Sequence, residues 1–193
     1  LEERAQLKAT LLEFGHVLDC RDNQPLGCTS AVKHIIRTGD VAPIYKKAYR
    51  VPHHHKATLD SLIQDQLDKG IIVPSQSPWA SPVVLVPKKS PDGTPKMRFC
   101  VDYRGLNAVT TPDVYPLPNI TETLDSLGGC TVFTTLDLRS GYHQIQVDEE
   151  SRPKTAFNVP GGHYEYQRMP FGLSTAPATF QRLMDSVLMG VKG

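Results

Sequence analysis

The stretch that decides the fold of this chain is Phe133-Thr134-Thr135-Leu136-Asp137-Leu138-Arg139-Ser140-Gly141-Tyr142. β-Branched and aromatic residues dominate its first half, and the turn-forming pairs Gly128-Gly129 and Ser140-Gly141 bound it. This pattern predicts a short buried strand over about residues 131–138 that carries Asp137 to its exit. An unpaired carboxylate in apolar surroundings is costly, so Asp137 requires solvent, hydrogen-bond donors or a metal ion.

From the residues alone, two interpretations of Asp137 stay open. An aspartate at a strand end often accepts hydrogen bonds from local backbone amides and so terminates the strand. A carboxylate in this position also suits a hard cation such as Mg²⁺. The surroundings of Asp137 must decide between a structural and a catalytic role.

The composition indicates a globular chain. Its 193 residues are 39% apolar, which is sufficient for one substantial domain or two small lobes. The formal net charge of +1 hides basic clusters over about residues 37–56 and 88–104, which allow a nucleic-acid partner. Four cysteines form no CxxC pair, and no secretory signal or membrane-spanning apolar run is present. We therefore expect an intracellular, reduced protein with no membrane association, cut from a longer chain.

The N-terminal part is weakly patterned. Residues 1–18 place apolar side chains at roughly helical spacing, which predicts an amphipathic helix. A zinc site is not expected, because no common ligand spacing is matched by His16, Cys20, Cys28 and His34.

A polar, turn-rich connector over residues 19–52 follows, with short extended runs at 32–37 and 43–49. His53-His54-His55 is interpreted as the solvated entry to a helix rather than a metal site, because three consecutive side chains point in divergent directions.

The remaining elements alternate between helices and strands without a βαβ period, so the predicted fold class is α+β. Helices are predicted over about residues 56–69, 120–127 and 174–189, a strand over 71–73, and hairpins over about 81–103 and 154–168.

The first hairpin carries basic side chains near its tip. Pro91-Asp92-Gly93 is predicted to form its turn, which places Lys88 and Arg98 on one two-stranded ribbon. These cations are either ordinary decoration of an exposed edge or part of a flap that closes over a polyphosphate, with Arg98 as a fork and Lys88 as a point charge.

Five motifs in a fixed order strengthen the second interpretation. They are Ser77-Pro78-Trp79-Ala80-Ser81-Pro82 through Lys89, Arg98-Phe99-Cys100-Val101-Asp102-Tyr103-Arg104-Gly105-Leu106-Asn107, Tyr115-Pro116-Leu117-Pro118, the Asp137 stretch, and Met169-Pro170-Phe171-Gly172-Leu173 to Gln181. Together they resemble the reverse transcriptase of gypsy-class long-terminal-repeat retrotransposons, from about Val32 onward.

The resemblance implies a right-hand polymerase. Residues 31–193 would form the reverse transcriptase fingers and the first part of its palm, truncated before the paired-aspartate hairpin. The fingers would contain the helix after His55 and the hairpin of residues 81–103, the palm would contain the strand of residues 131–138, and residues 1–30 would be a connector.

The resemblance also implies site residues for a two-metal nucleotidyl transfer. Asp137 and the backbone carbonyl of Leu138 would bind Mg²⁺, with two ions in the complete enzyme. Tyr142 would lie under the sugar and disfavour a 2′-hydroxyl, and Phe171 replaces the glutamine that retroviral relatives often carry near the sugar. The full dNTP-binding set implied is Lys88, Arg98, Arg139, Ser140, Gly141, Tyr142 and Phe171.

Further implied partners are an RNA or DNA template-primer and the rest of a Pol polyprotein, with thumb, ribonuclease H and integrase, in a cytoplasmic virus-like particle. The template or primer neighbours would be Asp102, Arg104, Asn107, Pro177 and Gln181.

One departure from the family stands out. Its second carboxylate motif is missing, since the sequence contains no adjacent Asp-Asp pair. We therefore expect the isolated chain to be inactive and to expose an apolar face that favours aggregation. The alternative function is a non-catalytic retrotransposon remnant or a co-opted module that binds nucleic acid or protein.

Overall fold

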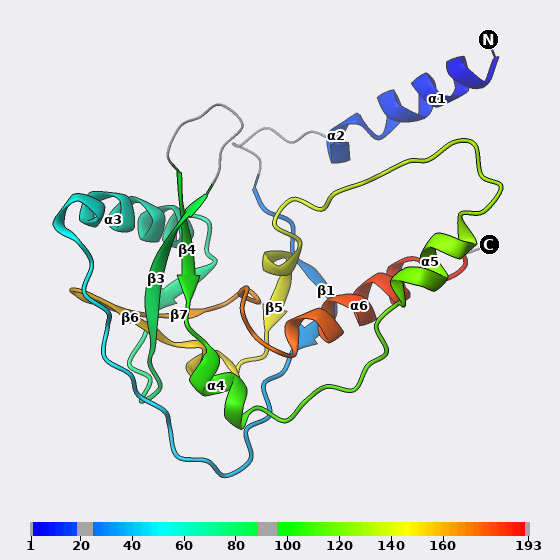
Figure 1. Cartoon of the computed structure of the whole chain (residues 1–193). Helices are drawn as coiled ribbons and strands as arrows, with labels where there is room; N and C mark the ends of the chain where they lie inside the picture. The colour runs from blue at the N-terminus through cyan, green and yellow to red at the C-terminus, as the bar shows by residue number, and fades with distance from the viewer. Residues whose placement is uncertain (1, 19–24, 89–95, 192–193) are drawn as a thin grey trace.

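The computed structural model describes residues 2–18, 25–88 and 96–191. Its larger sheet has five strands in the order β2-β7-β6-β3-β4 (Figure 1). The strands are β2 (Ile72–Pro74), β3 (Ser81–Lys88), β4 (Lys96–Val101), β6 (Phe157–Val159) and β7 (Gly162–Tyr166). Two antiparallel hairpins, β3-β4 and β6-β7, are joined by the parallel pairing of β3 with β6. Both predicted hairpins are confirmed, although the predicted Pro91-Asp92-Gly93 turn lies outside the described residues.

A second, two-stranded parallel sheet pairs β1 (Thr29–His34) with β5 (Ile145–Val147). It lies between the five-stranded sheet and α6 (Ala176–Val187) (Figure 1). The helix α6 contacts β1, and its apolar face provides the buried Leu183. The segment that carries Asp137 leads through η1 into β5, so the pairing of β5 with β1 fixes the end of that segment.

The other helices are α1 (Glu2–Glu13), α2 (Gly15–Leu18), α3 (His53–Asp68), α4 (Arg104–Val109) and α5 (Ile120–Ser126), with 3-10 turns η1 (Gly141–Gln144) and η2 (Arg152–Thr155). Of these helices, α3 packs against β2 and β4 of the large sheet. The helix α3 starts at His53 rather than near Lys56, with Pro52 as its N-cap in a non-helical conformation (φ −55°, ψ 142°), so the three histidines form its first turn. Among the described residues, none of these helices is long and apolar enough to cross a membrane.

The core centres on Phe157, which is fully buried. The rings of Phe99, Tyr164 and Tyr166 lie 5.3–5.8 Å from its ring, in tilted and edge-to-face arrangements. Such aromatic pairs contribute about 0.5–1.5 kcal/mol beyond the area they bury. The cluster fixes β4 against the β6-β7 hairpin, and so fixes the base of the strand that carries Arg98.

Tyr103 offers a direct test of this core. Its side chain is 1% exposed, and its hydroxyl donates a 2.7 Å hydrogen bond to the backbone carbonyl of Thr155. Replacing Tyr103 with Phe is expected to lower the free energy of unfolding by about 1–2 kcal/mol, because the buried hydrogen bond is lost. Urea denaturation measures the change. The matched variant Tyr45→Phe, on an exposed ring, should change stability by less than about 0.5 kcal/mol, and equal effects of the two variants would contradict this assignment.

The N-terminal helices differ from the prediction. Residues 2–18 form two helices rather than one, and none of their side chains is buried. The predicted amphipathic face therefore has no partner within the described residues, and both helices project away from the sheets (Figure 1).

The predicted strand over residues 131–138 is also wrong. The segment is extended but pairs with no strand among the described residues, and its apolar side chains are exposed, Val132 to 83% and Leu136 to 81%. Figure 1 shows it running outside both sheets between α5 and η1. A strand requires a neighbour to satisfy its backbone groups, and the β-favouring composition of residues 131–138 cannot supply one.

This segment predicts self-association of the isolated chain. Large exposed apolar side chains follow one another along α5, residues 131–138 and the end of α6: Ile120, Leu124, Val132, Phe133, Leu136, Val187 and Met189. Exposed apolar surface of this extent favours association. We expect sedimentation velocity at micromolar concentration to show oligomers, and the double variant Val132→Lys/Leu136→Lys to shift them toward monomer. The control double variant Leu7→Lys/Leu12→Lys on α1 should leave the distribution of oligomers unchanged. A wild-type chain that sediments as a monomer would contradict the prediction.

Candidate nucleotide and metal site

Asp137 lies at the end of the extended segment, with an exposed carboxylate. The chain turns directly after it, since the amide of Gly141 donates to the carbonyl of Leu138 at 3.2 Å. The Asp137 carboxylate and the Leu138 carbonyl, which belong to consecutive residues, therefore lie directly before the turn that leads into η1.

Ser140 makes this turn possible. Its backbone lies in the left-handed region, with φ 48° and ψ 47°, and among the described residues no other non-glycine residue has a positive φ. A left-handed conformation costs an L-residue about 1–2 kcal/mol, so the surroundings must hold it. The amide of His143 donates to the Ser140 carbonyl at 2.8 Å, and the side chain of Gln144 donates to the Arg139 carbonyl at 2.9 Å.

Gly141 is required by its neighbours. A Cβ atom at this position would lie 3.1 Å from the ring of Phe180 and 3.3 Å from the Cβ of Leu138. Glycine thus allows the turn to approach α6 closely, which sets the next residue, Tyr142, against the aromatic side chains around it.

Tyr142 lies in an aromatic stack. Its ring centroid is 4.9 Å from that of Phe171 with an interplanar angle of 22°, and 5.2 Å from that of Phe180. Partial burial raises the pKa of the Tyr142 hydroxyl, which therefore stays protonated at neutral pH. The stacked contact with Phe171 and the tilted contact with Phe180 hold the Tyr142 ring between β7-side and α6-side aromatic groups.

Two cavities meet at this stack. One, of about 780 Å³, is lined by Arg98, Arg139, Ser140 and Phe171, and the other, of about 770 Å³, is lined by Asp137, Leu138, Gly141 and Tyr142. Ser140 and Phe171 border both cavities. The structure thus brings most of the predicted nucleotide-binding residues together around two adjoining spaces.

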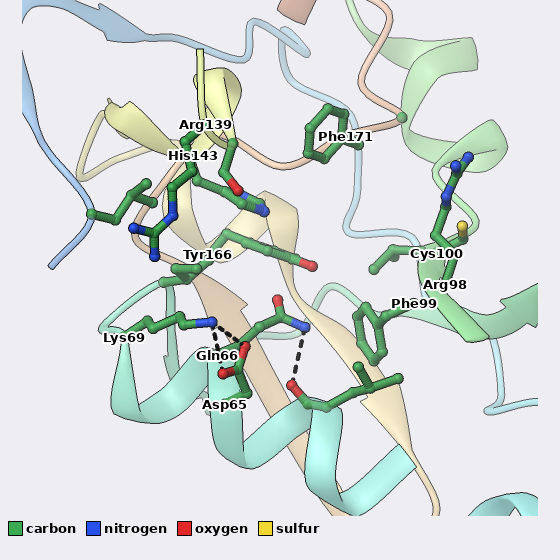
Figure 2. A pocket seen from close by; sticks show the side chains of 16 residues that line it. Asp65, Gln66, Lys69, Arg98, Phe99, Cys100, Arg139, His143, Tyr166 and Phe171 are labelled. Atoms are coloured by element: carbon green, nitrogen blue, oxygen red, sulfur yellow. Dashed lines mark hydrogen bonds and ion pairs between the residues drawn. The ribbon is translucent and has the colours of Figure 1, made fainter. Parts of the chain in front are cut away.

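Cations lie on opposite sides of the first cavity. Figure 2 shows Arg98 of β4 on one side of it and Arg139 and Lys69 on the other, with Tyr166 between them. In the hairpin register Val86 lies opposite Arg98 and Lys88 opposite Lys96, so Lys88 shares the Arg98 face and lies toward the tip. Lys88 is exposed and does not line either cavity.

Sequence reasoning missed several residues of this cavity. Asp65 and Gln66 of α3 and Lys69, directly after the helix, line it. Lys69 and Asp65 form a 2.7 Å ion pair, and Cys100 and His143 add to the lining. Charged positions of an amphipathic helix resemble an ordinary solvated face, so no local signal separates them from the exposed charges of the same helix. Burial lowers the pKa of His143, and its ring accordingly lines the cavity as neutral imidazole near pH 7.

The predicted template or primer neighbours line neither cavity. Arg104 forms a bidentate ion pair with Asp102, at 2.8 and 2.7 Å, and this guanidinium holds the pKa of the Asp102 carboxyl well below its usual range. Asn107 bonds the backbone of residues 172 and 174, and Gln181 donates to Asp185 at 3.1 Å. Pro177 is exposed in the first turn of α6.

The donors beside Asp137 fit Mg²⁺ in kind. Mg²⁺ takes oxygen ligands and is usually held by one or two carboxylates together with substrate phosphates and water, which matches the Asp137 carboxylate and the Leu138 carbonyl. Within residues 2–18, 25–88 and 96–191, no group of three His, Cys, Asp or Glu side chains could hold a metal ion. The described part of the chain thus supplies a partial oxygen site, while Cys20, one of the four residues considered for zinc, lies outside the described residues.

Comparison with known proteins agrees with this geometry. Residues 86–193 match the family described as reverse transcriptase (RNA-dependent DNA polymerase). The chain is 48% identical over 189 residues to the retrovirus-related Pol polyprotein from transposon 297 of Drosophila melanogaster, covering 97% of this chain and 18% of that polyprotein. It is 46% identical over 168 residues to the corresponding polyprotein from transposon gypsy of the same species, covering 86% of this chain and 16% of that one.

Solved structures give the same result. The prototype foamy virus protease-reverse transcriptase matches all of this chain with a TM-score of 0.85 and 29% identity, over 25% of its own length. The foamy viral enzyme in complex with an RNA/DNA hybrid matches with a TM-score of 0.79 and 27% identity, also covering all of this chain and 25% of its own. The predicted α+β polymerase fold and the gypsy-class resemblance are confirmed. This chain belongs to the reverse transcriptase (RNA-dependent DNA polymerase) family.

Proposed function

We propose that residues 31–193 form the fingers and the first part of the palm of an RNA-directed DNA polymerase, and that residues 1–30 connect them to a preceding part of a Pol polyprotein. The observation that carries the proposal is the shared wall of the two cavities. Ser140 and Phe171 separate the space reached by Arg98 from the space reached by Asp137. A nucleoside triphosphate needs cations at its phosphates and a carboxylate-bound metal at its α-phosphate, and the two spaces offer these on either side of one wall.

Each residue has a distinct role in this proposal. Arg98 and Lys88 bind the triphosphate, while the backbone amides of the Ser140 turn contact its phosphates. Tyr142 packs against the sugar, where its fixed ring leaves no room for a 2′-hydroxyl. Asp137 and the Leu138 carbonyl would hold Mg²⁺, which would supply activation of the primer 3′-hydroxyl and charge neutralisation at the phosphates.

The proposal includes partners that lie outside this chain. The second foamy virus structure contains an RNA/DNA hybrid, and we propose the same class of ligand, a template-primer, for this chain. Because the chain spans less than a fifth of the two transposon polyproteins that it matches, we propose that further carboxylates and the thumb, ribonuclease H and integrase come from other parts of a Pol polyprotein.

Arg98 provides the experiment for nucleotide binding. In a Pol protein that contains this chain, Arg98→Ala is expected to raise the KM for dNTP by about 10- to 100-fold, because a charge-assisted hydrogen bond contributes roughly 1.5–3 kcal/mol. Single-nucleotide incorporation on an RNA template, at varied dNTP concentration, measures this KM. The control Arg4→Ala removes the same charge from α1 and should leave KM unchanged. A KM that is unaffected by Arg98→Ala would contradict the proposed triphosphate contact.

A further inference from the structure

Asn107 joins two parts of the chain that are far apart in sequence. It lies in α4, and its side-chain Nδ2 donates to the carbonyl of Gly172 at 2.9 Å. Its Oδ1 accepts from the amide of Ser174, also at 2.9 Å. The two partners fix the orientation of the amide, since a flipped Asn107 would place like groups against each other at both ends.

The base of this bridge is rigid. The helix α4 is anchored by Leu106, which is buried, and the amide of Asn107 donates to the carbonyl of Tyr103 at 2.7 Å. Tyr103 is itself buried and bonded to Thr155. Asn107 therefore links the backbone of residues 172–174 to the buried core by hydrogen bonds.

The turn that Asn107 holds positions an exposed ring. Gly172 has a φ of +94°, which an L-residue rarely adopts, and directly precedes the buried Leu173. Phe171, on its other side, is 57% exposed, so burial alone does not fix its side chain. Its ring nevertheless stacks on Tyr142 at 4.9 Å and meets the edge of His143 at 5.3 Å.

We infer that Asn107 is a positioning residue for sugar selection: by clamping the Gly172–Ser174 backbone, it seats Phe171 on Tyr142 and so fixes the wall that faces the nucleotide sugar. This inference rests on the proposed function. It differs from the template contact that the sequence suggested for Asn107, because both polar atoms of its side chain are occupied by the backbone of residues 172 and 174. Asn107 acts through Phe171 and Tyr142 and does not itself contact the nucleotide.

The test measures selectivity between deoxynucleotides and ribonucleotides. In a Pol protein that contains this chain, kcat/KM is determined for dTTP and for UTP with wild type, Asn107→Asp and Asn107→Ala. Asn107→Asp retains an acceptor for Ser174 but sets a carboxylate oxygen against the Gly172 carbonyl. Both variants should lower the dTTP/UTP ratio about 5- to 10-fold, and affinity for the template-primer should remain within about twofold.

A double-mutant cycle with Phe171→Ala separates this role from general destabilisation. If Asn107 acts through Phe171, then Asn107→Ala lowers the ratio in the wild-type background but not in the Phe171→Ala background. The control Asn119→Ala removes a comparable side-chain bond, which Asn119 accepts from the amide of Thr121 at 2.9 Å, and should leave the ratio unchanged.

The outcomes are distinct. An unchanged ratio in Asn107→Asp and Asn107→Ala, or equal losses in both backgrounds, overturns the inference while the proposed function stands. A wild-type protein that binds template-primer yet incorporates neither nucleotide contradicts the proposed function itself. A loss of template-primer affinity with an unchanged ratio assigns Asn107 to the template instead.

Discussion

Asp137→Asn is expected to lower the rate of nucleotidyl transfer at least about 10³-fold, equivalent to about 4 kcal/mol of transition-state stabilisation. The substitution keeps the shape of the side chain but removes the negative charge that we propose binds Mg²⁺. The carboxylate is exposed and follows an unpaired segment, so the fold should not depend on it. We therefore expect the loss in catalysis without a loss in stability.

The measurement is single-nucleotide incorporation by a Pol protein that contains this chain, at saturating dNTP and Mg²⁺. Asp125→Asn, which removes an exposed carboxylate from α5, is the matched control and should retain wild-type activity. If the Asp137→Asn protein extended a primer at the normal rate, Asp137 would have the structural role that a lone aspartate at a turn often has.

The free energy of unfolding is expected to fall by about 3 kcal/mol between pH 6.5 and pH 4 because of His34. This side chain is completely buried on β1, and its Nδ1 is 2.9 Å from the hydroxyl of Thr179 on α6. Since Thr179 donates to the carbonyl of Thr175, the hydroxyl accepts from Nδ1–H of His34. Nε2 has no hydrogen-bond partner among the described residues.

Burial lowers the pKa of His34 from 6.5 to about 4, with the nearby negative charge of Asp113 opposing the shift. Between these two values the unfolded chain binds the proton and the folded chain does not, so acid favours unfolding. The stability is fully present above pH 6.5 and is lost as the pH falls toward 4. Protonation of the folded state would also place an unpaired N–H donor in the core.

Urea denaturation as a function of pH measures this effect, at a protein concentration where sedimentation shows monomer. His34→Asn keeps a donor for Thr179 and removes the titrating ring, so its stability should vary with pH by about 3 kcal/mol less than that of wild type. His16→Asn, at an exposed position of α2, should follow the wild-type curve. Parallel curves for wild type and His34→Asn would show that His34 titrates normally in the folded state.

The helices and hairpins formed by residues close together in the sequence could be predicted from local sequence patterns. The β3 strand contains a run of valine and leucine from Val83 to Val86, and α6 has an apolar face with Pro177 in its first turn. The first follows from local composition and the second from helical periodicity, and neither depends on distant partners. The motif order predicted one site for Arg98, Ser140, Tyr142 and Phe171, and in the structure these residues line two cavities that share Ser140 and Phe171.

The failures have a common physical cause. Residues 131–138 have strand composition, but strand formation requires a neighbouring strand that composition cannot reveal. The α3 lining of the cavity and the Asn107 bridge to Gly172 depend on contacts between segments distant in the sequence. Asn107 was predicted near the template from motif position, and only its hydrogen bonds point to the clamp on residues 172–174.

The most direct test of the central claim is Mg²⁺-dependent incorporation of dTTP on an RNA template with a DNA primer, by a Pol protein that contains residues 1–193 intact. The account predicts incorporation that is lost on removal of Mg²⁺ and in Asp137→Asn, while binding of the template-primer persists. A folded protein that binds the template-primer in a salt-sensitive manner but incorporates no nucleotide at any Mg²⁺ concentration would contradict the account, and would identify the chain as a nucleic-acid-binding module instead.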